Sequence, residues 1–185
     1  MSKYVRVSDI LSQLQDFSGI DPMVLSKKAE LGTEVHEAIQ NYVYGGFPYL
    51  SSDKANLYYQ SYIKWHEGHR PHYEWMEKRF FDDALMITGQ IDGYCCFDGN
   101  NKPMIIDYKT SYTANLNIWS LQAHFYWYLL KQSGIDPIGQ MSWIHLHRTG
   151  KIARTHTFEF SEEKLQQCIE LTHKYWENYN NARDI

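Results

Sequence analysis

The sequence predicts an α/β fold in which a mixed β-sheet is flanked by α-helices. Apolar residues at helical spacing dominate the first 70 positions and recur near 117–132 and after 161. Strand-like runs occupy 73–108 and 138–160. The order is therefore helices, three strands, a helix, two strands and a helix, which is typical of a sheet covered by helices. A length of 185 residues predicts one domain, 1–185, with a helical part at about 1–70 and the sheet with its helices at about 71–185.

Three helices are expected in the helical part. Ser8–Leu14 can form a short helix that Ser8 caps. An Asp-Pro pair at positions 21–22 has the pattern of an N-cap and a first helical residue, and the long helix that it begins ends at a Gly-Gly pair, 45–46. Ser52–Glu67 is the third helix, and Gly and Pro residues end it.

Three strands are expected next. Tyr73–Phe81 and Leu85–Phe97 have strand patterns, and the sequence DGNNKP, Asp98–Pro103, consists of residues that favour turns. Met104–Tyr108 is a short apolar run, as expected for a strand in the centre of a sheet.

The remaining elements alternate between helix and strand. Asn117–Gln132 is an aromatic-rich helix, and Ile138–His147 and Ile152–Phe160 are strands joined by a turn at Thr149-Gly150. Ser161 begins the last helix in an imperfect capping box.

The composition excludes several classes of protein. A net charge of −4 does not fit a generic basic nucleic-acid binder, so any such contact needs a local patch or bound cations. Three cysteines provide neither a disulfide framework nor a paired metal motif. No apolar run is long enough to cross a membrane, and no apolar leader is visible. We therefore expect an intracellular, cytoplasmic protein without membrane contact.

An acid and a base stand two positions apart after the apolar run "II". In a strand, Asp107 and Lys109 share one face and Tyr108 occupies the other. An exposed ion pair, worth under about 1 kcal/mol, is the simplest interpretation of Asp107 and Lys109 alone. Asp92 stands between two glycines in the preceding strand, and hairpin pairing would bring it close to Asp107. Neighbouring carboxylates repel each other unless a cation lies between them, and Mg²⁺ or Mn²⁺ suits oxygen ligands.

Two pairs of residues are each spaced one helical turn apart. Gly32 and His36 share a face of the long first-half helix, and Gln122 and Tyr126 share a face of the aromatic-rich helix. Helix packing explains Gly32, and a surface position is the simpler explanation of His36. An amphipathic helix does not explain a Gln in such apolar surroundings.

Taken in order, these four patterns resemble the PD-(D/E)XK nuclease superfamily, and more narrowly its RecB-like exonuclease branch. The matching motifs are Gly32-x-x-x-His36, Gly89-x-x-Asp92, Ile106-Asp107-Tyr108-Lys109 and Gln122-x-x-x-Tyr126. The resemblance implies a restriction-endonuclease-like fold and a metal-dependent DNA nuclease, an exonuclease acting on ends or single strands. DNA repair, recombination or phage DNA processing would be its setting.

The resemblance also implies roles for individual residues. The catalytic set would be Asp92, Asp107 and Lys109. The ligands of Mg²⁺ or Mn²⁺ would be His36, Asp92, Asp107 and the backbone carbonyl of Tyr108, with Glu77 as an upstream acid for a second metal. A surface position beside Lys78 is an equally open interpretation of Glu77. The residues that contact DNA would be Gln122, Tyr126, Thr110 and Ser111.

Some alternatives stay open. Many members of this branch bind an iron–sulfur cluster through four cysteines, and Cys95, Cys96 and Cys168 cannot supply that pattern, so we expect no cluster. A non-catalytic nucleic-acid-binding or assembly subunit and an RNA-directed nuclease remain rival interpretations. An oligomer or a protein partner is compatible with the sequence.

Overall fold

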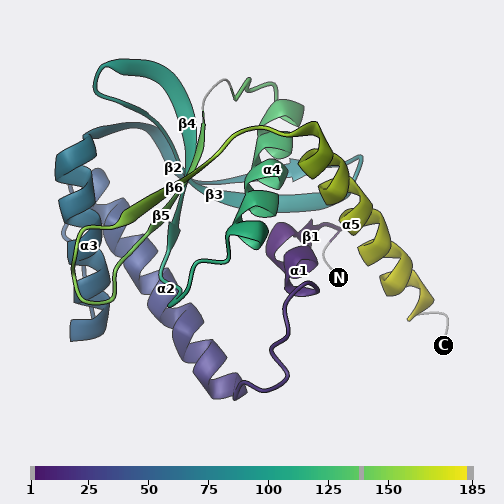
Figure 1. Cartoon of the computed structure of the whole chain (residues 1–185), viewed down its shortest axis with the longest axis horizontal. Helices are drawn as coiled ribbons and strands as arrows, with labels where there is room; N and C mark the ends of the chain where they lie inside the picture. Colours follow the sequence, from purple (N-terminus) through teal and green to yellow (C-terminus); the bar gives the residue numbers. More distant parts are fainter. Residues whose placement is uncertain (1–2, 138–139, 183–185) are drawn as a thin grey trace.

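A computed structural model describes residues 3–137 and 140–182. Its elements follow the predicted alternation (Figure 1). In chain order they are β1 Val5–Arg6, α1 Val7–Ser12, α2 Pro22–Val43, α3 Asp53–His69, β2 Pro71–Asp82, β3 Ile87–Phe97, β4 Asn100–Lys109, α4 Leu116–Gln132, β5 Met141–His145, β6 Arg154–Phe158 and α5 Glu162–Asn181.

The strands form one mixed sheet, as the sequence predicts. The order is β1-β3-β4-β5-β6, and β2 pairs with the other edge of β3. The β1–β3 and β4–β5 pairs are parallel, whereas the β2–β3, β3–β4 and β5–β6 pairs are antiparallel. β3 therefore has β2 along one edge, with β1 and β4 sharing the other.

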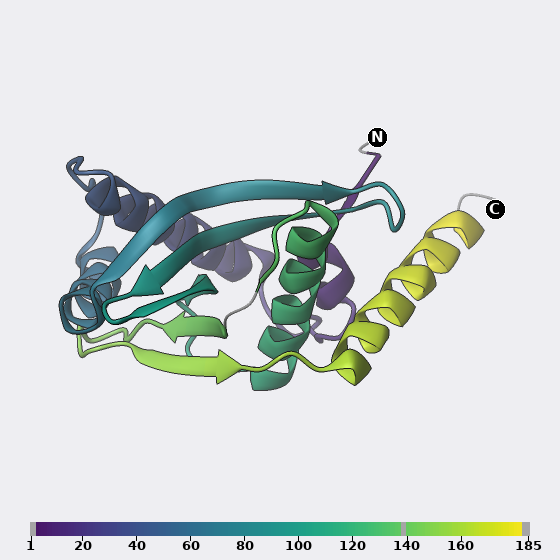
Figure 2. The ribbon, with the colours of Figure 1, turned by 90° about the horizontal axis from the view of Figure 1, so that it is seen from above.

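Helices cover both faces of the sheet. Figures 1 and 2 show α2 and α3 on one side, with α1, α4 and α5 on the other. Each face has its own apolar core, and alternate residues of one strand enter different cores. In β4, Ile105 packs into the core beneath α4, whereas Ile106 and Tyr108 pack into the core beneath α2 and α3.

Polar side chains begin three of the helices where the sequence predicts. The Asp21 carboxylate accepts from the backbone N–H of Met23, and the Ser52 and Ser161 hydroxyls accept from N–H groups three residues later. The predicted cap at Ser8 is wrong, because α1 begins at Val7. The preceding residues, Val5 and Arg6, form a short strand beside β3, so the chain enters the helix directly from the sheet.

The predicted turn Asp98–Pro103 is too long. β4 already begins at Asn100, and the tight turn before it contains Gly99 with φ 75°, which glycine adopts without strain. Pairing is irregular between Cys95 and Phe97, opposite the stretch that contains Pro103, since proline donates no ladder hydrogen bond. β6 is also shorter than predicted, and the predicted start of β5 at 138–139 lies outside the described residues.

The two glycines that flank Asp92 mark close side-chain packing. A Cβ at Gly89 would lie 2.8 Å from Leu129 Cδ1, and one at Gly93 would lie 3.0 Å from Tyr73 Cε1. A glycine within a strand often allows another group to approach the backbone closely. At Gly89 and Gly93 the approaching groups are side chains of the protein itself.

Within residues 3–137 and 140–182, none of the helices combines the length and apolar character that a membrane crossing requires.

Candidate active site

The β3–β4 hairpin brings together the two aspartates that the sequence places on separate strands. Gly93 pairs with Ile106, which sets Asp92 beside the end of β4. The backbone N–H of Tyr108 donates to Asp92 Oδ2 at 2.7 Å. Asp92 and Asp107 are only 6% and 2% exposed, so two carboxylates lie together out of water.

Asp107 and Lys109 lie on one face of β4, as strand geometry predicts. Lys109 Nζ is 2.6 Å from Asp107 Oδ2. The Tyr108 ring points to the opposite face, where its hydroxyl contacts that of Tyr73 at 2.5 Å and its ring packs edge-on against Tyr62. Burial makes this an enclosed ion pair, in contrast to the exposed pair that the two residue types alone suggest.

His36, Glu77 and Asp92 form a compact group of possible metal ligands. Their donor atoms lie within 4.8 Å of one another, with His36 Nδ1 3.4 Å from Asp92 Oδ2 and 3.6 Å from Glu77 Oε1. His36 comes from α2, Glu77 from β2 and Asp92 from β3. The structure therefore places Glu77, for which sequence reasoning gave the weakest case, inside the group.

The second nitrogen of His36 is held by the main chain. Nε2 lies 3.0 Å from the carbonyl oxygen of Tyr108. With Nε2 donating to this carbonyl, Nδ1 faces the two carboxylates, and a bound cation would take the place of the proton that they favour on Nδ1. The carbonyl that the resemblance assigns to the metal therefore orients His36 here, and its role as a ligand stays a prediction.

Glu77 lies opposite Asp92 in an unusual backbone conformation. The pairs Met76–Gly93 and Lys78–Ile91 flank this position, and Glu77 has φ 51° in the left-handed region, which is costly for a residue with a Cβ. Such strain is common at functional sites.

A relay of polar side chains fixes the Glu77 carboxylate. Gln90 Nε2 donates to Glu77 Oε2 at 2.7 Å, and Arg79 donates to Gln90 Oε1 at 2.5 Å. Sequence reasoning missed Gln90. The signal was its position two residues before Asp92, which puts both on one face of β3.

Burial and neighbouring charges shift the protonation of these groups. Burial raises the pKa of Asp107 to about 7, and the charge of Asp92 adds to this effect. Burial alone would raise the pKa of Asp92, but His36, together with Lys109 and the Tyr108 N–H, outweighs it and the pKa is lowered. For His36, burial lowers the pKa, but the charges of Asp92 and Glu77 outweigh burial and raise it well above the usual value.

These donors fit a hard divalent cation. Within the described chain, Glu77 Oε1 and Asp107 Oδ2 are buried and accept no well-directed hydrogen bond, although Lys109 Nζ lies close to the second. Buried carboxylate oxygens without partners are costly unless a cation or proton compensates them. Carboxylates with one imidazole suit Mg²⁺ or Mn²⁺.

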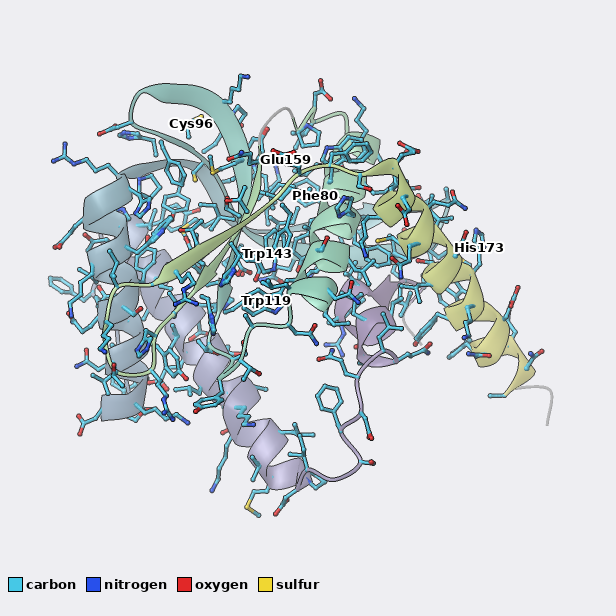
Figure 3. The ribbon with its side chains drawn as sticks, in the orientation of Figure 1. Phe80, Cys96, Trp119, Trp143, Glu159 and His173 are labelled. Carbon is cyan, nitrogen blue, oxygen red and sulfur yellow. The ribbon has the colours of Figure 1, made fainter. Side chains whose placement is uncertain are left out.

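Gln122 connects the two catalytic candidates of β4. Its amide donates to Asp107 Oδ1 at 3.3 Å, and its carbonyl oxygen accepts from Lys109 Nζ at 2.8 Å. The same amide donates to the Tyr126 hydroxyl at 2.8 Å, and Trp143 Nε1 donates to its carbonyl oxygen at 3.3 Å. Figure 3 shows Trp143 between α4 and the strands. These contacts explain a glutamine in an apolar helix.

Contact of Tyr126 with DNA stays a prediction, and its position in the structure leaves no room for a base to stack on its ring. Tyr126 is 6% exposed, and its ring lies against Gly89. It has no open face for a base, because α4 packs directly on the sheet at this point. Its hydroxyl accepts a hydrogen bond from Gln122, and Gln122 also bonds to Asp107 and Lys109.

Thr110 and Ser111 follow β4 and line an adjacent hollow. The Ser111 hydroxyl donates to the carbonyl of Thr113 at 3.0 Å, and Thr110 Oγ1 would lie 3.5 Å from a Cβ at Gly32. This is an ordinary van der Waals distance, so α2 lies beside this segment without requiring a glycine at position 32. Contact of Thr110 and Ser111 with DNA stays a prediction.

A comparison with protein families identifies the class. The sequence model of the PD-(D/E)XK nuclease superfamily matches residues 9–184. The chain belongs to the PD-(D/E)XK nuclease superfamily, which confirms the resemblance that the four motifs indicate. No curated protein sequence matches the chain significantly.

Solved structures share the fold at low sequence identity. An alkaline exonuclease from Laribacter hongkongensis is 8% identical with a TM-score of 0.54, over 98% of this chain and 90% of that one. A suspected exonuclease from Eubacterium rectale is 10% identical with a TM-score of 0.52, over 96% of this chain and 80% of that one. The mixed sheet flanked by helices is thus restriction-endonuclease-like, as predicted.

Proposed function

We propose that the protein is a divalent-metal-dependent deoxyribonuclease of the RecB-like branch, and that it acts as an exonuclease on DNA ends or single strands. The observation that carries the proposal is the contact between Asp107 and Lys109 beside the group of His36, Glu77 and Asp92. The exonuclease names of the two structural relatives support the finer assignment. DNA repair, recombination or phage DNA processing remains the proposed setting.

Mg²⁺ or Mn²⁺ would be held by His36, Glu77 and Asp92, whose donor atoms lie together, and by Asp107, the further ligand that the resemblance implies. When bound there, such an ion polarises a phosphodiester and lowers the pKa of a coordinated water. The protein contributes ligands whose positions are fixed before the substrate arrives: Gln90 holds Glu77, and the Tyr108 backbone holds both His36 and Asp92.

Lys109 supplies a positive charge at the place where phosphate charge would develop. The Lys109 side chain is 20% exposed and lines the hollow, and its ammonium contacts Asp107 and Gln122. A preorganised cation in a partly dry site stabilises a developing negative charge without reorganising first. Lys109 is therefore assigned to the phosphate, and Asp107 and Gln122 to its orientation.

The test is a cleavage assay on end-labelled single-stranded and duplex DNA and on RNA, in Mg²⁺, Mn²⁺ or EDTA. We expect stepwise loss of the labelled end of linear DNA, no cleavage in EDTA and none by an Asp92→Asn variant. A circular single strand is the control, because an exonuclease leaves it intact. Cleavage in EDTA would contradict the metal, cleavage of circles would contradict the exonuclease, and preference for RNA would favour the rival substrate. Binding without any cleavage would favour the non-catalytic subunit.

A further inference from the structure

Two hollows of opposite charge meet at α2 beside the candidate active site. The smaller, of about 340 Å³, contains the metal-ligand group, and the larger, of about 900 Å³, lies on the Lys109 side. Thr33 and His36 line both, so the two spaces adjoin at this turn of α2. The larger one is lined by residues of α2, of α3, of the segment that links β4 to α4 and of the loop after β5.

Acids and bases are separated between the two spaces. The smaller is lined by Glu37, Glu77 and Asp92 and, among the described residues, by no lysine or arginine; we call it the acidic hollow. The described lining of the larger contains no aspartate or glutamate. We call it the basic groove after its four cations, which are Lys28, Lys54, Lys109 and Arg148.

This separation stands out in a chain of net charge −4. In the part of the chain that the structure describes, Lys28, Lys54 and Arg148 make no ion pair with a carboxylate. Their charges are therefore available to a ligand. A third hollow of about 430 Å³ shares Arg148 with the groove, adds Arg154, and likewise has no described acidic lining.

The groove also offers aromatic faces. Phe17 is 40% exposed and Tyr112 is 70% exposed, and the guanidinium of Arg148 lies 4.5 Å from the Tyr112 ring centroid. Unpaired bases stack on such faces at about 1–3 kcal/mol per base, and an arginine beside the ring can hold the adjoining phosphate. A cation track with exposed rings favours an unpaired nucleic-acid strand over an apolar or acidic protein partner.

We infer that the protein holds an unpaired strand on one side of the scissile phosphate only, along the basic groove from Lys109 to the Arg148–Tyr112 pair. This inference rests on the proposed function. On the other side, Glu37, Glu77 and Asp92 repel any phosphate that a bound cation does not hold. Such a one-sided hold suits cleavage close to a strand end.

The test measures binding of a fluorescein-labelled 15-nucleotide single strand by anisotropy at several NaCl concentrations. Ca²⁺ serves as the oxygen-seeking cation, and a gel checks that the strand stays intact. We expect Lys28→Ala, Lys54→Ala and Arg148→Ala each to weaken binding and to reduce the slope of log K against log [NaCl] by about 0.7, the value for one lost phosphate contact.

Matched controls separate the groove from general charge. Lys27→Ala and Lys151→Ala remove the same charge from exposed neighbours outside the hollows, and they should leave the slope unchanged. Equal weakening by groove and control variants would overturn the inference, as would no weakening by any groove variant.

One further variant tests whether the hold is one-sided. Glu37→Gln removes a charge from the acidic hollow, and we expect less than about a twofold change in affinity because the strand does not pass there. A marked gain in affinity would show that the strand crosses both hollows. If the wild-type protein cleaves DNA while the groove variants bind it normally, the inference fails and the nuclease assignment stands. If it neither binds nor cleaves, both fail.

Discussion

The amide of Gln122 lies between Asp107 and Lys109, donating to the carboxylate at 3.3 Å and accepting from the ammonium at 2.8 Å. One neutral side chain on α4 thus fixes both charged groups of β4. In the structure Gln122 holds the candidate catalytic pair, whereas the resemblance assigned it to contact with DNA.

Gln122→Leu should lower kcat about 10–100-fold and leave the affinity for a single strand in Ca²⁺ nearly unchanged. The physical reason is loss of orientation, because Leu can make none of the four hydrogen bonds. Tyr126→Phe is the matched control, since it removes only one of these bonds and should have a smaller effect. A raised Kd with normal kcat would instead support direct contact of Gln122 with DNA.

Lys109→Met should reduce cleavage by roughly 100-fold or more while Mn²⁺ binding survives. A protonated lysine cannot ligate a cation, and its removal leaves His36, Glu77 and Asp92 in place. Calorimetric Mn²⁺ titration compares this variant with Asp92→Asn, which should lose binding. Lys131→Met is the control, because it removes a lysine that lines none of the described hollows and forms an exposed ion pair with Asp136. Loss of Mn²⁺ binding in Lys109→Met would contradict the assigned role.

The raised pKa of Asp107 predicts that the stability of the metal-free protein, measured in EDTA, depends on pH. Its pKa is raised to about 7 in the folded protein, against about 3.9 in an unfolded chain. Between these values the folded state retains a proton that the unfolded state has released, so this contribution is complete below about pH 4 and is lost as pH rises through 7.

The Tm of the wild-type protein in EDTA should therefore fall from pH 5 to pH 8 by more than that of Asp107→Asn. His36, whose pKa is also raised, changes stability in the same direction in both proteins, so the larger fall of the wild-type protein reports the contribution of Asp107. Parallel Tm profiles for the two proteins would show that Asp107 titrates normally.

The positive φ of Glu77 predicts that a glycine variant at this position is more stable than an alanine variant, the reverse of the usual order in a strand. At φ 51°, Glu77→Gly should have a free energy of unfolding about 1 kcal/mol higher than Glu77→Ala, since alanine bears the left-handed strain. Lys78, the next residue on β2 and without a positive φ, is the control: Lys78→Ala should be the more stable of its pair. Urea unfolding in EDTA measures all four variants. The same order at both positions would rule out strain at Glu77.

The sequence by itself determined most of the elements and the candidate catalytic pair. Alternation in β4 placed Asp107 and Lys109 on one face with Tyr108 opposite, because strand geometry has a period of two residues. Caps such as Asp21 and Ser52 began their helices where predicted, because capping is a local hydrogen bond.

Only the tertiary structure decided how remote elements combine around that pair. The strand Val5–Arg6, the left-handed Glu77 and its hold by Gln90 depend on pairing across the sheet, which local periodicity does not encode. Gln122 turns inward to Asp107 and Lys109 because α4 packs on the sheet there and a buried amide needs partners. Spacing along the chain specifies which residues share a face, whereas burial and strand register decide which of them meet.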